Sequence, residues 1–269
     1  MLKKRCLNRL RSLLIVPIVV LVFGACQLAP RGVSPIPSSA ANFNANSPGQ
    51  LAYISGDGNV YVVPADLSRK TRITGDATTS REGAGLSYQR LAWSPTGQLA
   101  YAAVTRTRDN AASTLYVKDS LTDPPKIVEQ SDEHFVIYIY WSPVACADQP
   151  GCHRLAYLIE EAEDIGLHFV QITDQAISNQ IIGFGWPYYF SWSADGQSIV
   201  WHTGGGYQEN PAAELALYDL AEAKTHRFPH QPAGFLAPAW SPRDNIWIGA
   251  TISKGDAMLR QFSPESTTA

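Results

Sequence analysis

The sequence predicts an all-β fold, a β-propeller of five blades, each of about 48 residues and each built from a four-stranded antiparallel sheet. Three observations support this prediction. A short motif around Trp, Ser and Pro recurs at nearly equal intervals. Only 17% of the 269 residues are charged, while 20 Gly, 18 Pro and 10% aromatic residues favour a turn-rich fold over coiled coils or disordered tails. No stretch shows a convincing helical period.

The repeat consists of five units that begin at residues 46, 93, 141, 192 and 240. The intervals of 47, 48, 51 and 48 residues match the length of a propeller blade. The four later units carry Trp-Ser followed by Pro or Ala, and the first has Asn46 in place of Trp. A β-sandwich, the alternative fold, does not explain so regular a period.

Each unit contains four strand signals. A short apolar run leads into the motif, Ser-Pro-x-Gly supplies a tight turn, and further strands follow. The runs before the motif cover residues 90–92, 136–140, 188–191 and 236–239; the second strands cover 99–104, 154–159, 198–202 and 246–252; the third cover 59–63, 114–117, 167–172, 215–218 and 258–262; and the fourth cover 70–73, 126–128, 180–182 and 226–228. Four short strands per repeat are typical of a blade.

The Trp-Ser-Pro-Asp-Gly pattern resembles the WD-like repeat of TolB-type propellers, over residues 46–262. That family includes the periplasmic component of the Tol-Pal system and the propeller domains of several peptidases, so the resemblance implies a fold and no single function. TolB itself has an additional N-terminal α/β domain that finds no match here. The resemblance therefore extends to the blade and not to the Tol-Pal role.

The repeated tryptophans are expected to be structural. A Trp at the same place in each blade buries roughly 200 Å² against its neighbour. We therefore assign packing between adjacent blades to Trp93, Trp141, Trp192 and Trp240.

The N-terminus has the features of an export signal. Residues 1–25 contain five cations and no acid, and an apolar run at 13–23 follows the cations. That run is too short for a comfortable bilayer span, which needs about 20 residues. Gly24-Ala25-Cys26 resembles a bacterial lipoprotein signal, in which cleavage precedes a lipidated Cys, although Phe23 replaces the usual Leu. An uncleaved anchor or ordinary signal cleavage also places the body outside the cytoplasm.

Beyond residue 25 the chain divides into a tether and a propeller. Residues 26–45 are rich in Pro, Ser, Ala and Asn, and we expect a tether between a lipid on Cys26 and a propeller over 46–269.

The whole chain has a formal net charge of −3, but five of its 21 cations lie in residues 1–25. The rest of the chain therefore has 16 cations and 24 acids, a net charge of −8. Such a balance argues against nucleic acid as the main partner, because phosphate binding requires a basic face.

Two of the four cysteines are expected to form a disulfide. Cys146 and Cys152 flank a Pro-Gly loop within the motif turn of the third unit, in a chain that carries an export signal. The alternative is a metal pair with His153, which lacks one ligand of a closed zinc site. We assign no metal ion and no cofactor.

Enzyme signatures are missing from the sequence. It contains no Gly-x-Ser-x-Gly elbow, His-Glu-x-x-His pair, phosphate loop or Gly-x-Gly-x-x-Gly. The six His are scattered, and we assign no catalytic residue. The acidic run at 160–164 fits a solvated loop, a patch for a basic partner or, less well, a calcium site, because the Asp-x-Asp-x-Asp-Gly spacing is missing.

The partner-binding face is expected where long loops gather. The loops between second and third strands (105–113, 160–166, 203–213) and those between blades (81–88, 131–134, 183–188, 230–235) emerge on the same face. Aromatic, basic and acidic residues on these loops form the predicted face: Tyr88, Arg106, Arg108, His134, Glu161, Asp164, Trp186, Tyr188, Tyr207 and Phe235. The alternative is that the aromatic residues plug the channel.

These observations predict a lipid-anchored, extracytoplasmic propeller that binds a protein or glycan partner and has no enzymatic activity. One alternative is a cell-envelope hydrolase or lyase, which needs two carboxylates about 5–10 Å apart at the propeller mouth. Another is a fragment of a longer propeller array. Because the fifth unit lacks an outer strand, we also predict that residues 33–43 pair with residues 258–262 and close the ring.

Overall fold

The computed structural model describes residues 49–78, 84–108, 110–146, 149–161, 163–206, 210–234 and 236–264. The chain divides into two compact units, Met1–Ala40 and Ala41–Ala269, and all described residues belong to the second. The predicted signal segment, Cys26, the tether and the closing segment 33–43 lie outside the described residues. Within the described ranges, no helix is both long and apolar enough to cross a bilayer.

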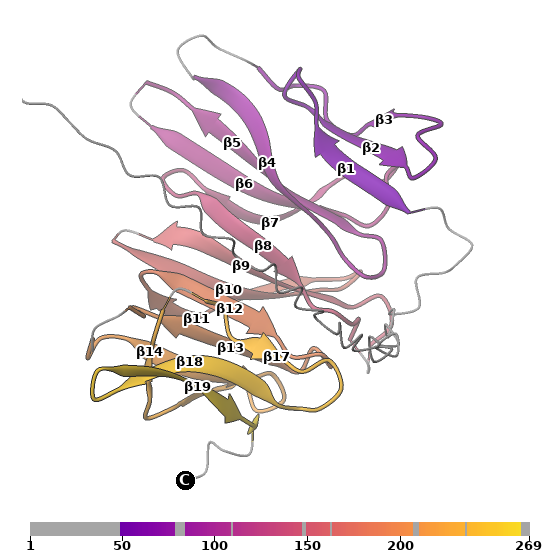
Figure 1. Cartoon of the computed structure of the whole chain (residues 1–269). Helices are drawn as coiled ribbons and strands as arrows, with labels where there is room; N and C mark the ends of the chain where they lie inside the picture. The colour runs from indigo at the N-terminus through magenta and orange to yellow at the C-terminus, as the bar shows by residue number, and fades with distance from the viewer. Residues whose placement is uncertain are drawn as a thin grey trace, which may run out of the picture. The chain divides into compact units, whose positions relative to one another are not determined.

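The described residues form five antiparallel sheets that follow one another in chain order (Figure 1). The first contains β1 (Gln50–Ile54), β2 (Val60–Pro64) and β3 (Thr71–Arg72). The second contains β4 (Gly85–Trp93), β5 (Leu99–Arg106), β6 (Ala111–Lys118) and β7 (Lys126–Ser131). The third contains β8 (Val136–Trp141), β9 (His153–Glu161), β10 (Asp164–Ile172) and β11 (Ile177–Gly185). The fourth contains β12 (Tyr188–Trp192), β13 (Ser198–Thr203), β14 (Glu214–Asp219) and β15 (Lys224–Arg227).

The fifth sheet contains β16 (Gln231–Pro232), β17 (Ala239–Trp240), β18 (Trp247–Ser253) and β19 (Asp256–Phe262). Both short strands, β16 and β17, pair with β18, and β19 pairs with the other side of β18. The sheets thus repeat one meander per sequence unit, which confirms the predicted all-β propeller. We number the blades one to five in this order.

The Ser of the repeated motif builds the turn between the first two strands of a blade. In blade two, Oγ of Ser94 accepts hydrogen bonds from the amides of Thr96 (3.2 Å) and Gln98 (2.9 Å). In blade four, Oγ of Ser193 accepts from the amides of Gln197 (3.1 Å) and Ser198 (2.9 Å). A side-chain acceptor at this position satisfies turn amides that have no strand partner, which explains why Ser recurs.

Tryptophans of the motif connect adjacent blades through their indole nitrogens. Nε1 of Trp141 donates to the carbonyl oxygen of Ala92 in blade two (3.0 Å), and Nε1 of Trp192 donates to that of Tyr140 in blade three (3.1 Å). Trp93 and Trp240 are only partly buried, and their Nε1 atoms have no hydrogen-bond partner among the described residues. The predicted role between blades thus has a directional contact at two of the four positions.

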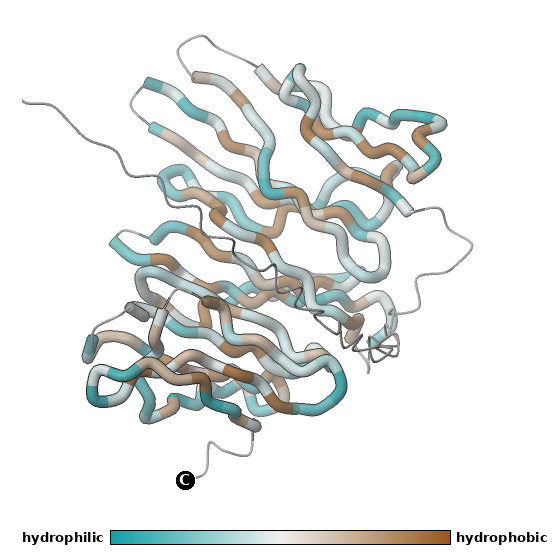
Figure 2. The backbone as a smooth tube through the Cα atoms, viewed as in Figure 1, coloured by the Kyte–Doolittle hydropathy of each residue, from teal (hydrophilic) through white to brown (hydrophobic). Residues whose placement is uncertain are grey.

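The hydrophobic core lies between the blades rather than in one central cluster. One cluster joins blades two and three around Leu115, Trp141 and Leu155, and another joins blades three and four around Leu167 and Trp201. Figure 2 shows that hydrophobic residues are concentrated along the strands and that hydrophilic residues lie in many of the connecting turns. Each blade is therefore held by apolar burial against its neighbours.

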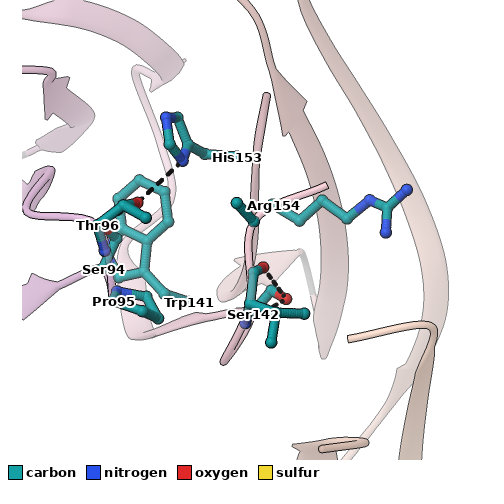
Figure 3. A pocket seen from close by; sticks show the side chains of 9 residues that line it. Ser94, Pro95, Thr96, Trp141, Ser142, His153 and Arg154 are labelled. Atoms are coloured by element: carbon teal, nitrogen blue, oxygen red, sulfur yellow. Dashed lines mark hydrogen bonds between the residues drawn. The ribbon is translucent and has the colours of Figure 1, made fainter. Parts of the chain in front are cut away.

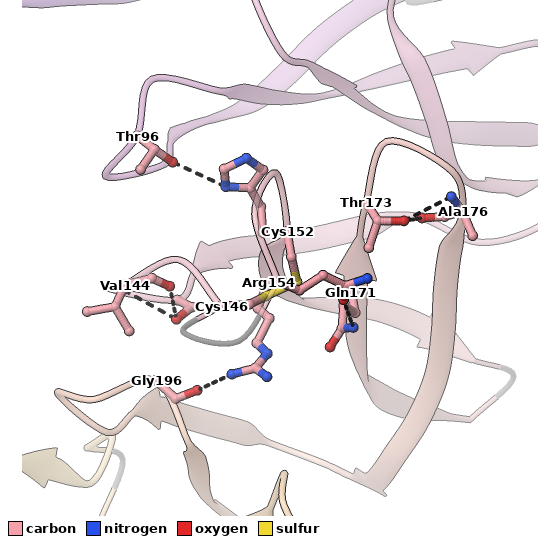
Figure 4. The surroundings of a disulfide bond; sticks show 12 residues. Thr96, Val144, Cys146, Cys152, Arg154, Gln171, Thr173, Ala176 and Gly196 are labelled. Atoms are coloured by element: carbon pink, nitrogen blue, oxygen red, sulfur yellow. Dashed lines mark hydrogen bonds between the residues drawn. A yellow bond between two sulfur atoms is a disulfide. The ribbon is translucent and has the colours of Figure 1, made fainter.

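The motif turn of blade three is enlarged and closed by a disulfide between Cys146 and Cys152 (Figure 4). Next to it, the guanidinium of Arg154 donates to the carbonyl oxygen of Gly196 in blade four (3.4 Å), and Nδ1 of His153 lies 3.2 Å from Oγ1 of Thr96 in blade two. This turn therefore connects three blades.

A crevice beside the enlarged turn is too small to be a substrate site. It contains about 150 Å³ of space, open to solvent, and its lining includes Ser94, Trp141, His153 and Arg154 (Figure 3). Typical ligand pockets have about 300–1,000 Å³. Its lining residues include no carboxylate, so it offers none of the acid–base pairs that a glycosidase requires.

Candidate partner-binding surface

Two residues of the predicted binding face are buried. Tyr88 is 9% exposed and its hydroxyl donates to Oδ1 of Asp76 (2.6 Å), while Tyr188 is 5% exposed. Burial is the main cause that raises the pKa of both phenols. Their assignment to the binding face was wrong. Tyr88 is the buried residue of β4, and Tyr188 is the first residue of β12, whose side chains alternate between buried and partly buried.

Three of the seven loops on this side are shorter than the sequence predicts. Strands β5 and β6 leave only residues 107–110 between them, β9 and β10 leave 162–163, and β11 and β12 leave 186–187. Strand pairing continues into the segments that were assigned to loops, with Asp164 opposite Glu161 at the end of the β9–β10 hairpin. In blades two and three the predicted face is therefore carried by hairpin ends. Between β13 and β14, residues 204–213 connect the strands, close to the predicted loop at 203–213.

The remaining predicted residues that the structure describes lie near these hairpin ends in blades two and three. Arg106 and Arg108 are exposed, and the Arg106 guanidinium lies 5.3 Å from the centre of the Phe135 ring. His134 is half-buried, and its carbonyl oxygen accepts from Oγ of Ser113 (2.6 Å). Tyr207 and Phe235 lie outside the described residues.

At one end of blade three, β9 and β10 turn and β11 ends, and we call this the upper end of the blade. The structure brings Glu161, Asp164 and Trp186 together there. The β9–β10 hairpin lies beside the preceding interblade loop, because the amide of Glu160 donates to the carbonyl oxygen of Phe135 (3.0 Å). Trp186, just after β11, is 68% exposed. Asp164 is exposed, and the Glu161 side chain is 30% exposed.

Two apolar side chains next to Trp186 were missed by the sequence analysis. On β11, Ile181 is 45% exposed and Phe184 is 49% exposed. Ile181 lies opposite His168 and Phe184 lies opposite Gly166, and residues directly opposite in an antiparallel pair share a face. We refer to the three exposed residues of this segment together as the β11 strip: Ile181, Phe184 and Trp186.

The reason they were missed is a register shift. The pairing of β10 with β11 shifts between Leu167 and His168, which interrupts the two-residue alternation that sequence reasoning follows. The sequence signal that could have indicated these exposed residues is the presence of large apolar side chains in an outer strand.

A polar network next to the β11 strip connects blades two and three. The hydroxyl of Tyr157 (β9) donates to Oε2 of Glu129 (β7) at 2.7 Å. Nδ2 of Asn179 (β11) donates to the same Oε2 and to the Tyr157 oxygen, both at 2.8 Å. Nδ1 of His168 (β10) lies 2.9 Å from the Tyr157 oxygen, and its Nε2 lies 3.3 Å from Oε1 of Glu161.

The network adds polar contacts to the apolar packing between blades two and three. Tyr157 is fully buried and stacks on the His168 ring, with centres 4.7 Å apart. Because the Tyr157 proton is directed to Glu129, Nδ1 of His168 acts as the donor toward the Tyr157 oxygen. Burial, together with the bond to Glu129, raises the pKa of Tyr157, so this phenol stays protonated.

Gly166 leaves room for Glu161 beside His168. A methyl group at Gly166 would lie 3.1 Å from Cγ of Glu161 and 3.4 Å from Nε2 of His168. A side chain there would displace Glu161 or His168. The glycine thus keeps one carboxylate at the edge of the β11 strip.

The surface around the β11 strip has a mixed chemical character. It combines exposed apolar and aromatic side chains with carboxylates on short, strand-borne hairpin ends. Among the described residues, no group of three or more His, Cys, Asp or Glu side chains is placed to hold a metal ion. Glu129 accepts hydrogen bonds from the Tyr157 hydroxyl and from Asn179.

Comparison with known proteins identifies structures of similar fold. No family model matches the sequence, and no curated protein matches it. A crystal structure of TolB from Acinetobacter baumannii aligns with a TM-score of 0.38 and 13% identity, over 81% of this chain and 62% of that one. An oligogalacturonate lyase from Vibrio parahaemolyticus aligns with a TM-score of 0.33 and 12% identity, over 81% of this chain and 76% of that one.

A structure from a study of two prolyl endopeptidases aligns with a TM-score of 0.45 and 13% identity, over 77% of this chain and 29% of that one. This chain therefore spans less than two thirds of the TolB chain and less than one third of the endopeptidase chain. The neighbours include TolB as well as enzymes, and at these identities no activity or partner is transferred to this chain.

Proposed function

We propose that this protein is an extracytoplasmic, non-enzymatic propeller that binds a partner protein through the upper end of blade three. The observation that carries the proposal is the β11 strip, in which three large apolar side chains are 45–68% exposed on or directly after one strand. Contiguous exposed apolar side chains with a polar border are characteristic of protein interaction sites. Trp is also the residue most enriched among the residues that dominate binding energy.

The hydrogen bonds that hold strands β10 and β11 in place support a recognition role. Strand β11 is held at its centre by Asn179, and β10 by His168, both within the network that reaches Glu129 of blade two. A surface that is ordered before binding loses less conformational entropy when a partner docks.

The proposed location rests on the N-terminal sequence. Residues 1–25 carry the features of an export signal, and we propose lipidation of Cys26 as the membrane anchor. The disulfide between Cys146 and Cys152 supports an oxidising compartment. Replacement of Cys26 by Ser should abolish labelling by a radioactive fatty acid, and continued labelling would contradict the anchor.

Site-specific crosslinking tests the proposed surface. Full-length protein carrying the photoreactive benzoylphenylalanine at position 186 should form a defined covalent adduct in cells of its own organism. Position 236 is a matched control, because Leu236 is also 68% exposed but lies in blade five. Phe184→Ala should weaken the adduct at 186 and leave the thermal midpoint within a few degrees, because Phe184 is half-exposed.

The results distinguish a partner surface from ordinary exposure. An adduct at 186 that is missing at 236 and lost in Phe184→Ala supports the proposal. Equal adducts at both positions, or no adduct at 186, would contradict it.

A glycan is the second candidate partner, and a pair of tyrosines on β8 favours it. Tyr138 is 47% exposed and Tyr140 is 42% exposed, and both rings contact Phe190 of blade four, with centres 5.8 and 6.1 Å away. Neither hydroxyl has a hydrogen-bond partner in the described part of the chain. Stacking rings with free hydroxyls suit a sugar ring.

An oligosaccharide titration tests this second candidate. An N-acetylglucosamine trimer should change the tyrosine fluorescence of the wild type and leave that of the Tyr138→Ala/Tyr140→Ala variant unchanged. Equal responses in both proteins would exclude the tyrosine pair as a glycan site.

A further inference from the structure

Strand β11 has the longest outer edge in the described structure. It is the outermost strand of blade three and pairs only with β10. It has nine residues, whereas the outermost strands of blades one, two and four, β3, β7 and β15, have two, six and four. The outward backbone N–H and C=O groups of a long edge strand are available to pair with another strand.

The side chains on and near this edge are apolar or acidic, and this combination favours one kind of partner. Ile181 and Phe184 supply apolar surface, and the carboxylates of Glu160, Glu163 and Asp164 are exposed at the upper end of the same blade. The described structure contains no ion pair for any of these three carboxylates. They are therefore free to meet cations of a binding partner.

We propose that an extended, basic segment of a partner protein adds to the free edge of β11 as a fifth strand of blade three. This inference rests on the proposed function and names how the partner binds. Main-chain hydrogen bonds to β11 supply affinity, apolar side chains of the segment pack on the β11 strip, and its Lys or Arg residues meet the carboxylates of the β9–β10 hairpin. Charge complementarity sets the partner class, because the chain after residue 25 carries a net charge of −8.

Other occupants of this edge fit less well. A second copy of the chain would bring its own acidic hairpin and a second net charge of −8, which disfavours pairing of two β11 edges. Residues 26–48 contain a single cation, Arg31, and four Pro, which lack the amide that a strand ladder needs. A basic segment from another protein can pair with the backbone groups of β11 and can also neutralise the nearby carboxylates.

The test uses three synthetic nine-residue peptides with the purified full-length protein. One alternates Lys and Val, the second alternates Glu and Val, and the third alternates Lys and Gly, so that charge and strand propensity vary separately. Fluorescence anisotropy measures binding, and amide hydrogen exchange reports on β11. We expect binding of the Lys–Val peptide alone, slowed exchange in residues 177–185, and affinity that falls about tenfold or more between low salt and 0.5 M salt.

Matched variants locate the site. Ile181→Lys places a positive charge on the edge strand and should abolish peptide binding, whereas Ile127→Lys, at a 52% exposed isoleucine of outer strand β7, should not. Glu163→Gln/Asp164→Asn should weaken binding and its salt dependence, whereas Asp123→Asn/Asp256→Asn, at exposed acids elsewhere, should leave both unchanged.

The outcomes separate this inference from the proposed function. Equal binding of the Glu–Val or Lys–Gly peptide, unchanged exchange in β11, or equal effects of Ile181→Lys and Ile127→Lys would overturn strand addition. If the adduct at position 186 still forms and still depends on Phe184, the partner surface stands and only its binding mode is wrong. Loss of that adduct contradicts the proposed function itself.

Discussion

The hydroxyl of Tyr157 in β9 donates a 2.7 Å hydrogen bond to Oε2 of Glu129 in β7, so a fully buried side chain of blade three is bonded to a carboxylate of blade two. These residues are 28 positions apart and belong to different sheets. The bond therefore contributes to the contact between blades and not to the folding of either blade alone.

Replacement of Tyr157 by Phe should destabilise the protein by about 1.5–3 kcal/mol, the usual range for a hydrogen bond to a charged group. Urea unfolding followed by circular dichroism measures the change. Tyr140→Phe is the control, because its hydroxyl has no partner among the described residues and its removal should cost little. Equal losses in both variants would show that the Glu129 bond is not important.

Replacement of Trp192 by Phe should cost about 1 kcal/mol more than replacement of Trp240 by Phe, because only Trp192 uses its indole N–H in a bond to the adjacent blade. Both changes remove a similar volume. Trp192 is also more deeply buried than Trp240, which adds to the expected difference between the two variants. Thermal unfolding of the wild type and both variants provides the measurement. An equal or larger loss for Trp240→Phe would contradict the assigned role of the Tyr140 carbonyl.

Stability should fall as the pH decreases below 6.5. Burial is the largest cause that lowers the pKa of His202, which is 3% exposed, and burial also lowers the pKa of His153 and His230. A histidine with a lowered pKa in the folded state is protonated first in the unfolded state, so acid favours unfolding from the ordinary value of 6.5 downward. The free energy of unfolding between pH 7.5 and 5 tests this.

The variant His202→Gln should reduce that pH dependence, since it removes one titrating group whose Nε2 lies 2.6 Å from the carbonyl oxygen of Leu236. His226→Gln serves as the control, because His226 lies beside Glu222 at 3.3 Å on the surface of blade four. A steeper or unchanged dependence in His202→Gln would contradict the assignment.

Deletion of residues 33–43 should destabilise blade five if this segment is its missing outer strand. The segment lies outside the described residues, and β19 pairs only with β18 among the described strands. Hydrogen exchange in residues 256–262 should become faster after the deletion, while exchange in β9 and β10 should stay the same. Unchanged exchange in β19 would make a truncated array the better explanation.

The repeat made the fold predictable because each unit carries its turn chemistry within a few residues. The roles of Ser94 and Ser193 depend on amides no more than five positions away, so the motif can be recognised locally. Strand ends could not be predicted as well. Tyr88 was assigned to a loop because the apolar run before the motif was recognised only over residues 90–92, whereas β4 begins at Gly85.

The candidate site was only partly predictable, since its parts meet across large sequence separations. Glu161, Asp164 and Trp186 were visible as charged or aromatic residues near turns. The bond between Asn179 and Glu129 joins positions 50 residues apart, and Phe184 shares a face with Gly166 only because β10 and β11 pair in one particular register. Local patterns contain no information about such pairings.

The indole bonds between blades have a consequence for the history of the chain. The acceptor of each bond is the carbonyl directly before the preceding tryptophan: Ala92 before Trp93, and Tyr140 before Trp141. A segment copied in frame from one such tryptophan to the next would therefore carry a donor for the blade before it and an acceptor for the blade after it. Gene duplication could insert a blade without breaking this junction, and the number of blades could change while the joint between them was preserved.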